Sequence, residues 1–365
     1  MSDNARIGAD RAEGTSHGSG NPSAVSYSVD VSYTKILKSL RNDGFEDACT
    51  AEAAFLFERT SEWHMRPYLE VAAKVLGFKS IKLAHDLMHF DRRCQSVLFE
   101  YIGVFETQLR AQFGHWLKEE GGDYAIHEQR LFSNNKNYQD SISRLRAEAS
   151  RKAKHSKTFS NYMDGDRIHI DAAVECMSLG TLSQLYSNCR QTENTRKIAE
   201  SFGVSKGDLV NWSRTITAAR NACAHFDCLF LRKQLQKTPR AIRGIDGMSS
   251  RKPFYLVLLI EKLLSSNMVF GDQTLHYSSM LAIRITDEIE QVEKNVPGLM
   301  DYLGLSEDWR NIFASPDLVD ALIVSAWVDE EWETLSLGLA SDEVYLPGSF
   351  KRAGVRVLPK DVIQE

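Results

Sequence analysis

Residues 84–119 read AHDLMHFDRRCQSVLFEYIGVFETQLRAQFGHWLKE and form the longest periodic stretch of the chain. Large side chains recur there at spacings of three and four, the pattern of one apolar stripe on an amphipathic helix. The stripe consists of Leu87, Phe90, Cys94, Val97, Leu98, Tyr101, Phe105 and Leu109. Gly121 and Gly122 follow, and we expect the helix to end there. Because neighbouring helices must bury such a stripe, the stretch predicts a helical bundle.

The composition agrees with an all-α globular protein. Of the 365 residues, 43% are hydrophobic and 25% are charged, which suffices for a real core, while 22 glycines and 8 prolines are too few for a turn-rich β architecture. We find neither a run of about 18 apolar residues nor an apolar leader, so no membrane segment and a cytoplasmic location are expected. The six cysteines form no CxxC pair and fit reduced, buried thiols.

Three regions are predicted along the chain. Residues 1–30 carry almost no large apolar groups and are expected to be a disordered tail. Residues 31–300 hold the helical patterns and form one domain, whereas residues 301–365 form an extension with a short irregular appendage, a hairpin within its last twenty residues. Pro67 predicts a helix start or a kink within 61–75. Further helices are predicted over 33–43, 49–59, 170–200, 206–235, 254–266 and 275–294.

The residues best suited to chemistry lie in the run Ala-Arg-Asn-Ala-Cys-Ala-His at 219–225. On a regular helix Asn221 and His225 share one face, because they are four residues apart. Arg220 lies about 140° around the axis from His225 and about 7.5 Å along it, so the two diverge. We therefore expect Arg220 to reach in from the side, aided by a distortion or a helix end near Ala224, or by a second copy of the motif.

These three side chains suit the cleavage of RNA without a metal. Histidine transfers protons near neutral pH, and the arginine fork donates two parallel hydrogen bonds to a phosphate. In this interpretation His225 is the general base or acid, Arg220 holds the scissile phosphate and Asn221 orients the groups. The products would carry a 2′,3′-cyclic phosphate, and DNA, which lacks the 2′-OH, would not be cut.

The arginine–histidine spacing is a weak signal by itself, because it also occurs at Arg59–His64 and Arg110–His115. The first pair is interpreted as incidental. For Arg110 and His115, both a structural role and a place in an RNA groove remain open.

A zinc site is a second way to interpret the end of the motif. Cys223, His225 and Cys228 form a C-x-H-x-x-C pattern, but no fourth ligand follows at customary spacing and Cys223 falls on an apolar stripe. We therefore expect neither a metal nor a cofactor.

Basic side chains offer candidate RNA contacts. The net charge of −5 excludes a generally cationic coat, so an RNA must meet local patches. One patch lies within 144–157, where a solvated helix face is an equal alternative, and another lies beyond the motif. The candidate contacts are Arg110, His115, Arg144, Arg146, Arg151, Lys152, Arg232 and Lys233.

The run Arg220–His225 resembles the R-x4-6-H signature of the HEPN superfamily, in the R-N-x-C-A-H form of Abi-like (AbiD/AbiF) abortive-infection proteins. Two upstream segments are similar to that family in the same order. They are Phe90-Asp91-Arg92-Arg93 with Glu106 and Arg110, and Glu175 followed by Ser178-Leu179-Gly180-Thr181-Leu182-Ser183-Gln184-Leu185-Tyr186. The resemblance covers roughly residues 30–262. Relatives often carry a second histidine and an R-L-W-N-like run after the motif, where this chain has Phe-Asp-Cys-Leu-Phe.

The resemblance implies a HEPN-type helical bundle, a homodimer that brings two motifs together, and metal-independent ribonuclease or RNA-binding activity in phage defence. The leading hypothesis is therefore an endoribonuclease. The alternative is a non-cleaving protein that holds a structured small RNA as a ribonucleoprotein, and the missing second histidine favours it. A third hypothesis is a helical adaptor whose motif is vestigial.

Overall fold

The structure is a computed structural model that describes residues 31–245, 247–264, 269–270, 273–274 and 277–305. Within these residues the fold is all-α, as the sequence predicts, and β structure is confined to short antiparallel pairs. The predicted N-terminal tail and the predicted C-terminal hairpin lie outside the described residues.

The α-helices are α1 Val31–Asn42, α2 Ala51–Arg59, α3 Glu62–Glu70, α4 Ile81–Gly121, α5 Asn135–His155, α6 Lys157–Ser160, α7 Ile170–Cys176, α8 Leu179–Asn188, α9 Glu193–Glu200, α10 Lys206–Ala224, α11 Tyr255–Leu264, α12 Tyr277–Glu293 and α13 Leu299–Leu303. The strands are β1 Met163–Asp164, β2 Arg167–Ile168, β3 Val269–Phe270 and β4 Gln273–Thr274.

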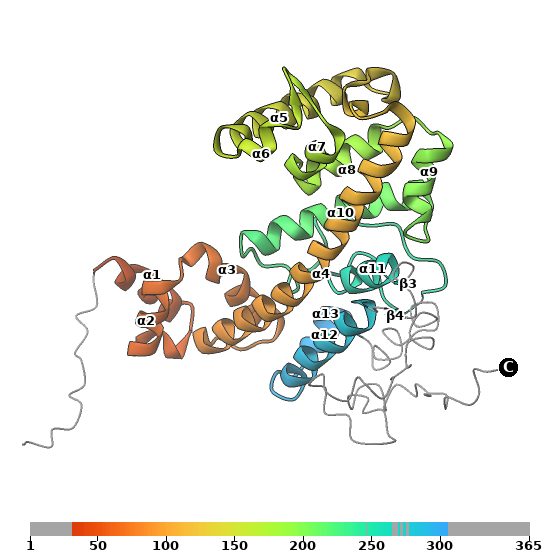
Figure 1. Ribbon diagram of the computed structural model, residues 1–365. Helices are drawn as coiled ribbons and strands as arrows, with labels where there is room; N and C mark the ends of the chain where they lie inside the picture. Colours follow the sequence, from red (N-terminus) through yellow and green to blue (C-terminus); the bar gives the residue numbers. More distant parts are fainter. Residues whose placement is uncertain (1–30, 246, 265–268, 271–272, 275–276, 306–365) are drawn as a thin grey trace, which may run out of the picture.

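Helix α4 is the axis of the molecule. Its 41 residues span about 60 Å, and the other helices are arranged around it: α1–α3 at its start, α5–α9 at its end and α11–α13 along its first half (Figure 1). Ser80 caps its first turn by accepting from the backbone N–H of Leu83, and Gly122, with φ 76°, ends it. The predicted apolar stripe is buried along the whole helix, so α4 is the core against which the other elements pack.

Helix α3 contains Pro67 in its interior, and it continues into a π-helical turn at Val71–Val75. Pro67 therefore does not mark a helix start; α3 runs through it, and the irregular turn follows at Val71–Val75. At the other end of the domain, α13 extends across residue 300, where the C-terminal extension was expected to begin. None of the helices in the described ranges combines the length and the apolar character that a membrane span requires.

Helix α10 ends at Ala224, so the predicted extent of 206–235 is wrong at its C-terminal end. His225 is the C-cap, and Phe226 adopts the left-handed conformation with φ 54°. The N–H of Asp227 donates to the carbonyl of Ala222 at 2.9 Å and that of Phe226 to Cys223 at 3.2 Å, which is the Schellman pattern. The motif therefore occupies the last turn of a helix and its cap.

Candidate functional site

A buried carboxylate on α4 determines the path of the chain after the motif. The side chain of Asp91 is fully buried and accepts hydrogen bonds from the backbone N–H groups of Leu229, at 3.0 Å, and Phe230, at 2.7 Å. It also accepts from the Tyr68 hydroxyl at 2.7 Å and from Gln95 Nε2 at 3.0 Å. The chain is thus bound to α4 from Leu229 onward, after the capped end of α10, and cannot continue that helix.

The electrostatics of this carboxylate reflect two opposed effects. Burial raises the pKa of Asp91, and the hydrogen bond from Tyr68 and those from the two backbone N–H groups lower it in part. Gln95 extends the contact, because its Nε2 also donates to the carbonyl of Asp227 at 2.9 Å. Asp91 and Gln95, one turn apart on α4, therefore hold the segment 227–230 in place directly after His225.

The face of α10 that carries Asn221 and His225 lines a cleft, and Thr217 extends it into what we call the cleft strip. Thr217, Asn221 and His225 lie on the wall of a cavity of about 750 Å³ between α10, α8, the start of α5 and the segment after α10. The motif side chains Asn221 and His225 are both exposed. The cleft is polar, with Ser183, Gln184 and Ser187 from α8 on the facing wall. The shared face inferred from the spacing of four is therefore present and open to a ligand.

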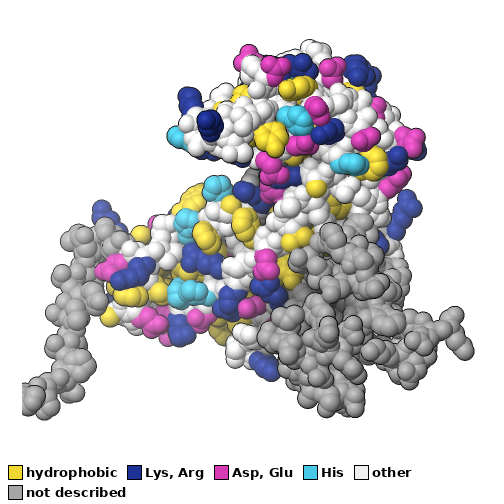
Figure 2. Space-filling view, in the orientation of Figure 1, with side chains coloured by type: hydrophobic (Ala, Val, Ile, Leu, Met, Phe, Trp, Pro, Cys, Tyr) yellow, Lys and Arg dark blue, Asp and Glu magenta, His cyan; other side chains and the backbone are white. Residues whose placement is uncertain are grey.

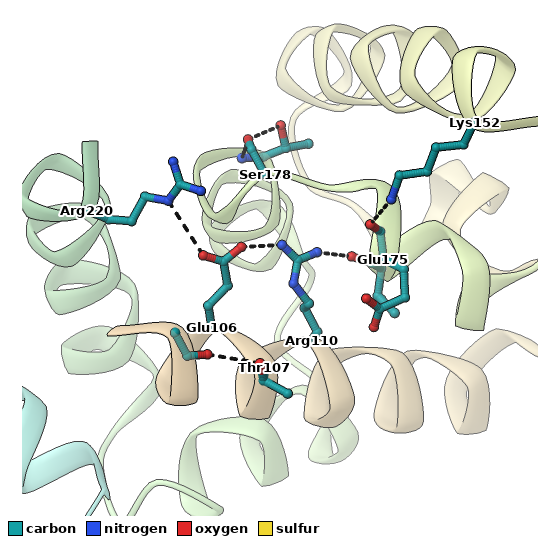
Figure 3. A network of polar contacts seen from close by, with 10 residues as sticks. Glu106, Thr107, Arg110, Lys152, Glu175, Ser178 and Arg220 are labelled. Atoms are coloured by element: carbon teal, nitrogen blue, oxygen red, sulfur yellow. Dashed lines mark hydrogen bonds and ion pairs between the residues drawn. The ribbon is translucent and has the colours of Figure 1, made fainter. Parts of the chain in front are cut away.

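Arg220 points away from this cleft. Its Nε lies 3.8 Å from Glu106 Oε2 on α4, and Glu106 also accepts a hydrogen bond from Arg110, which donates a second one to the carbonyl of Val174 (Figure 3). One carboxylate thus bridges two arginines. The predicted divergence of Arg220 and His225 is confirmed, but the expected reach of Arg220 to their side of the helix is not found within one chain. The motif is divided between the cleft and the Glu106 network.

Arg110 and His115, the Arg-x4-His pair on α4, lie in different surroundings. The Arg110 side chain is only 14% exposed, and its donors are used by Glu106 and Val174, so it braces the network. His115 is exposed farther along α4, where its ring meets the edge of Trp116 at 4.6 Å between centroids, and it does not line the cleft.

The predicted basic patch on α5 is only partly available. Arg151 pairs with Glu148, and Lys152 Nζ donates to the carbonyl of Glu175 at 2.5 Å, which ties the end of α5 to α7 (Figure 3). Arg144 and Arg146 are exposed. Figure 2 shows the molecule hollowed between α5–α7 and the end of α10, with charged side chains at the base of the hollow.

The basic patch predicted beyond the motif contributes a cation to the cleft. Arg232 lines the same cleft as His225, whereas Lys233 lines a neighbouring groove beside α3. The structure also brings Arg214 and Lys237 to the cleft. Sequence analysis did not select Arg214, although it precedes Thr217 by three residues and so continues the same helical face.

The cysteines near the motif are separated from its histidine. Cys223 and Cys228 are buried, and burial raises the pKa of the Cys223 thiol to about 12. His225 is exposed. Among the described residues, no three histidine, cysteine, aspartate or glutamate side chains gather in a way that could hold a metal ion.

Comparison with known proteins identifies a family for the central part of the chain. The profile of a family described as Abi-like protein matches residues 64–231, a segment that runs from α3 to the residue after Phe230 and includes the cleft strip, the Glu106 network and the Asp91 contacts. No curated protein and no solved structure matches the chain. Residues 64–231 are therefore similar to Abi-like proteins, a likeness that suggests abortive infection, a form of defence against phage.

Proposed function

We propose that the protein is a metal-independent endoribonuclease of the HEPN type that acts in abortive infection. The observation that carries the proposal is the polar cleft in which Asn221 and His225 lie side by side. Arg214, Arg232 and Lys237 line the same cleft, so a phosphodiester backbone entering it would meet three cations. A histidine beside bound phosphates is what proton transfer during RNA cleavage needs.

The chemistry requires no further reactant. His225 takes the proton of a 2′-OH, whose oxygen then attacks the adjacent phosphorus. The bond from phosphorus to the 5′ oxygen breaks, and that oxygen receives a proton from an acid. The products are a 2′,3′-cyclic phosphate and a 5′-OH. Arginine donors stabilise the charge that grows on the phosphate oxygens, and Asn221 orients the reacting groups.

The proposal includes a homodimer, for a geometric reason. The described part of the cleft is lined by one histidine, His225, whereas the reaction uses a base and an acid. Arg220 lies on the neighbouring face of α10, held by Glu106. A second copy of the chain with its α10 end facing the first would supply the second histidine and bring an Arg220 to the scissile phosphate.

The test is cleavage of end-labelled single-stranded RNA by the full chain in the presence of EDTA. We expect the wild type to cut, His225→Ala to be inactive and a DNA of the same sequence to stay intact. His64→Ala is the matched control, because His64 on α3 also follows an arginine, Arg59, by five residues. This variant should leave cleavage unchanged. Cleavage that requires a divalent metal, or that persists in His225→Ala, would overturn the proposal.

A second candidate function is supported by the division of the motif. Because Arg220 does not line the cleft and no second histidine follows in 226–230, a protein that holds a structured RNA without cutting it also fits. Retention of one homogeneous RNA species through purification at moderate salt, with no cleavage, would favour this candidate. Equal protection against phage by the wild type and by Arg220→Ala/His225→Ala would instead indicate an adaptor that does not use the motif.

A further inference from the structure

Two arginine–phenylalanine pairs line the seam where α4 crosses the end of α10. The guanidinium carbon of Arg92 lies 5.8 Å from the centroid of the Phe226 ring, and that of Arg220 lies 5.7 Å from the centroid of Phe99. Each helix therefore places an arginine beside an aromatic ring of the other. Both distances lie within the range of cation–π contacts.

Both rings are open to solvent. Phe226 is 57% exposed and Phe99 is 40% exposed, so both aromatic faces can be reached by a ligand beside the end of α10. Arg92 and Phe99 are seven residues apart on α4, so they share one face and are about 10 Å apart along the axis. The two pairs thus form a short track that begins at the residue after His225.

The conformation of Phe226 is a second, independent observation. Its φ of 54° lies in the left-handed region, where glycine is the usual residue at the end of a helix. A bulky side chain is disfavoured in this conformation, because its Cβ crowds the following carbonyl oxygen. Strain of this kind is concentrated at functional sites, and here it holds an aromatic ring in solvent directly beside the motif.

Arg92 provides a third observation. Its Nε has no hydrogen-bond partner, and no ion pair with an acidic side chain of the described residues is found for it. The charge of this partly exposed guanidinium beside Phe226 is therefore not matched by a carboxylate, and it would attract an anionic ligand. Phosphate oxygens are suitable acceptors at this position.

We propose that Arg92, Phe99, Arg220 and Phe226 form a stacking track for unpaired nucleobases of single-stranded RNA, next to the His225 cleft. This inference rests on the proposed function and names the form of its substrate. Proteins that hold single strands combine aromatic side chains, on which bases stack, with cations that contact the backbone. Two exposed rings along one seam suit bases of one strand, whereas a duplex would hide its base faces.

The track is tested by equilibrium binding of a fluorescent 2′-O-methyl RNA 12-mer, which has no 2′-OH to attack. Phe99→Leu and Phe226→Leu keep an apolar side chain and remove the aromatic face. Because stacking on an aromatic side chain contributes about 1–3 kcal/mol per base, we expect each variant to weaken binding by at least about fivefold. Phe55→Leu is the matched control, since Phe55 is 41% exposed on α2 and has the Arg59 guanidinium carbon 3.6 Å from its ring centroid.

A second probe distinguishes stacking from phosphate contacts. With an abasic strand of equal length, the wild type and both leucine variants should bind equally weakly. Wild-type affinity of the variants for the 12-mer would overturn the track, and it would leave the proposed function intact if His225→Ala still abolishes cleavage. A change of the variants from dimer to monomer, measured by sedimentation at equal thermal stability, would also overturn it by assigning the rings to a contact between protein chains.

Discussion

Asp91 on α4 accepts a 2.7 Å hydrogen bond from the backbone N–H of Phe230, although 139 residues separate the two in sequence. This bond and its neighbour to Leu229 direct the chain away from α10 just after the motif. Asp91 lies in the segment Phe90-Asp91-Arg92-Arg93, the first of those that resemble Abi-like proteins. Its physical task in this chain is to place the segment that follows His225, so the first and the last of the family-like segments are parts of one structural unit.

Removal of this carboxylate should destabilise the protein severely. Asp91→Ala leaves two backbone N–H groups and the Tyr68 hydroxyl buried without an acceptor, and we expect a loss of about 3–5 kcal/mol in the free energy of unfolding. Urea denaturation measures the change. Asp140→Ala, at an exposed position on α5, should stay within about 0.5 kcal/mol of wild type. A loss below about 1 kcal/mol in Asp91→Ala would show that Asp91 does not hold the segment.

Loss of the Glu106 carboxylate, which pairs with both Arg110 and Arg220, should strengthen RNA binding and slow turnover. Glu106→Gln removes the negative charge shared by Arg110 and Arg220, so RNA phosphates should bind more tightly, while Arg220 loses the partner that orients it. We expect a lower KM together with a several-fold lower kcat in the cleavage assay. Glu100→Gln, on the same helix but paired with Arg284, should change neither constant. A higher KM in Glu106→Gln would contradict this role.

The cations of the cleft should set the salt dependence of RNA binding. Arg214→Ala and Arg232→Ala should each weaken binding and lower the slope of log K against log salt by up to about one. Titration of the 2′-O-methyl 12-mer between low and moderate salt measures the slope. Arg196→Ala provides the control, because Arg196 is exposed on α9 and does not line the cleft. An unchanged slope in both cleft variants would place the RNA elsewhere.

Histidines on α4 should make the fold sensitive to acid. Burial and the neighbouring His89 lower the pKa of His85, and the two Nε2 atoms are 3.0 Å apart. A lowered pKa means that the folded state prefers the neutral ring, so this contribution to stability is present above the unfolded value of about 6.5 and is lost as pH falls. Urea denaturation at pH 7 and 5.5 should show a smaller loss for His85→Gln than for wild type. An equal loss would contradict the assignment, and His155→Gln on α5 should behave like wild type.

Thiol labelling should distinguish the cysteines by burial. Iodoacetamide at pH 8 should modify the exposed Cys49 first, whereas burial raises the pKa values of Cys189 and Cys223 to about 12 and should protect both until the protein unfolds. Peptide mass mapping over time measures the order. Modification of Cys223 as fast as Cys49 would mean that the α10 end opens readily, or that Cys223 is exposed beside His225.

The sequence by itself determined the features that depend on neighbours within a few residues. The apolar stripe of 84–119 predicted α4, because helical periodicity is visible within a single segment. The spacing of four between Asn221 and His225 predicted their common face, and the spacing of five predicted that Arg220 would diverge.

Only the tertiary structure decided where α10 ends and which charges accompany its motif. No glycine or proline marks Ala224 as the last helical residue; the chain leaves the helix there and is bound to α4 five and six residues later, where Asp91 accepts from Leu229 and Phe230. In the same way, Glu106 rather than the cleft holds Arg220, and Arg232 reaches the cleft while Lys233 does not. These outcomes depend on contacts between segments far apart in the sequence, and local periodicity carries no information about such contacts.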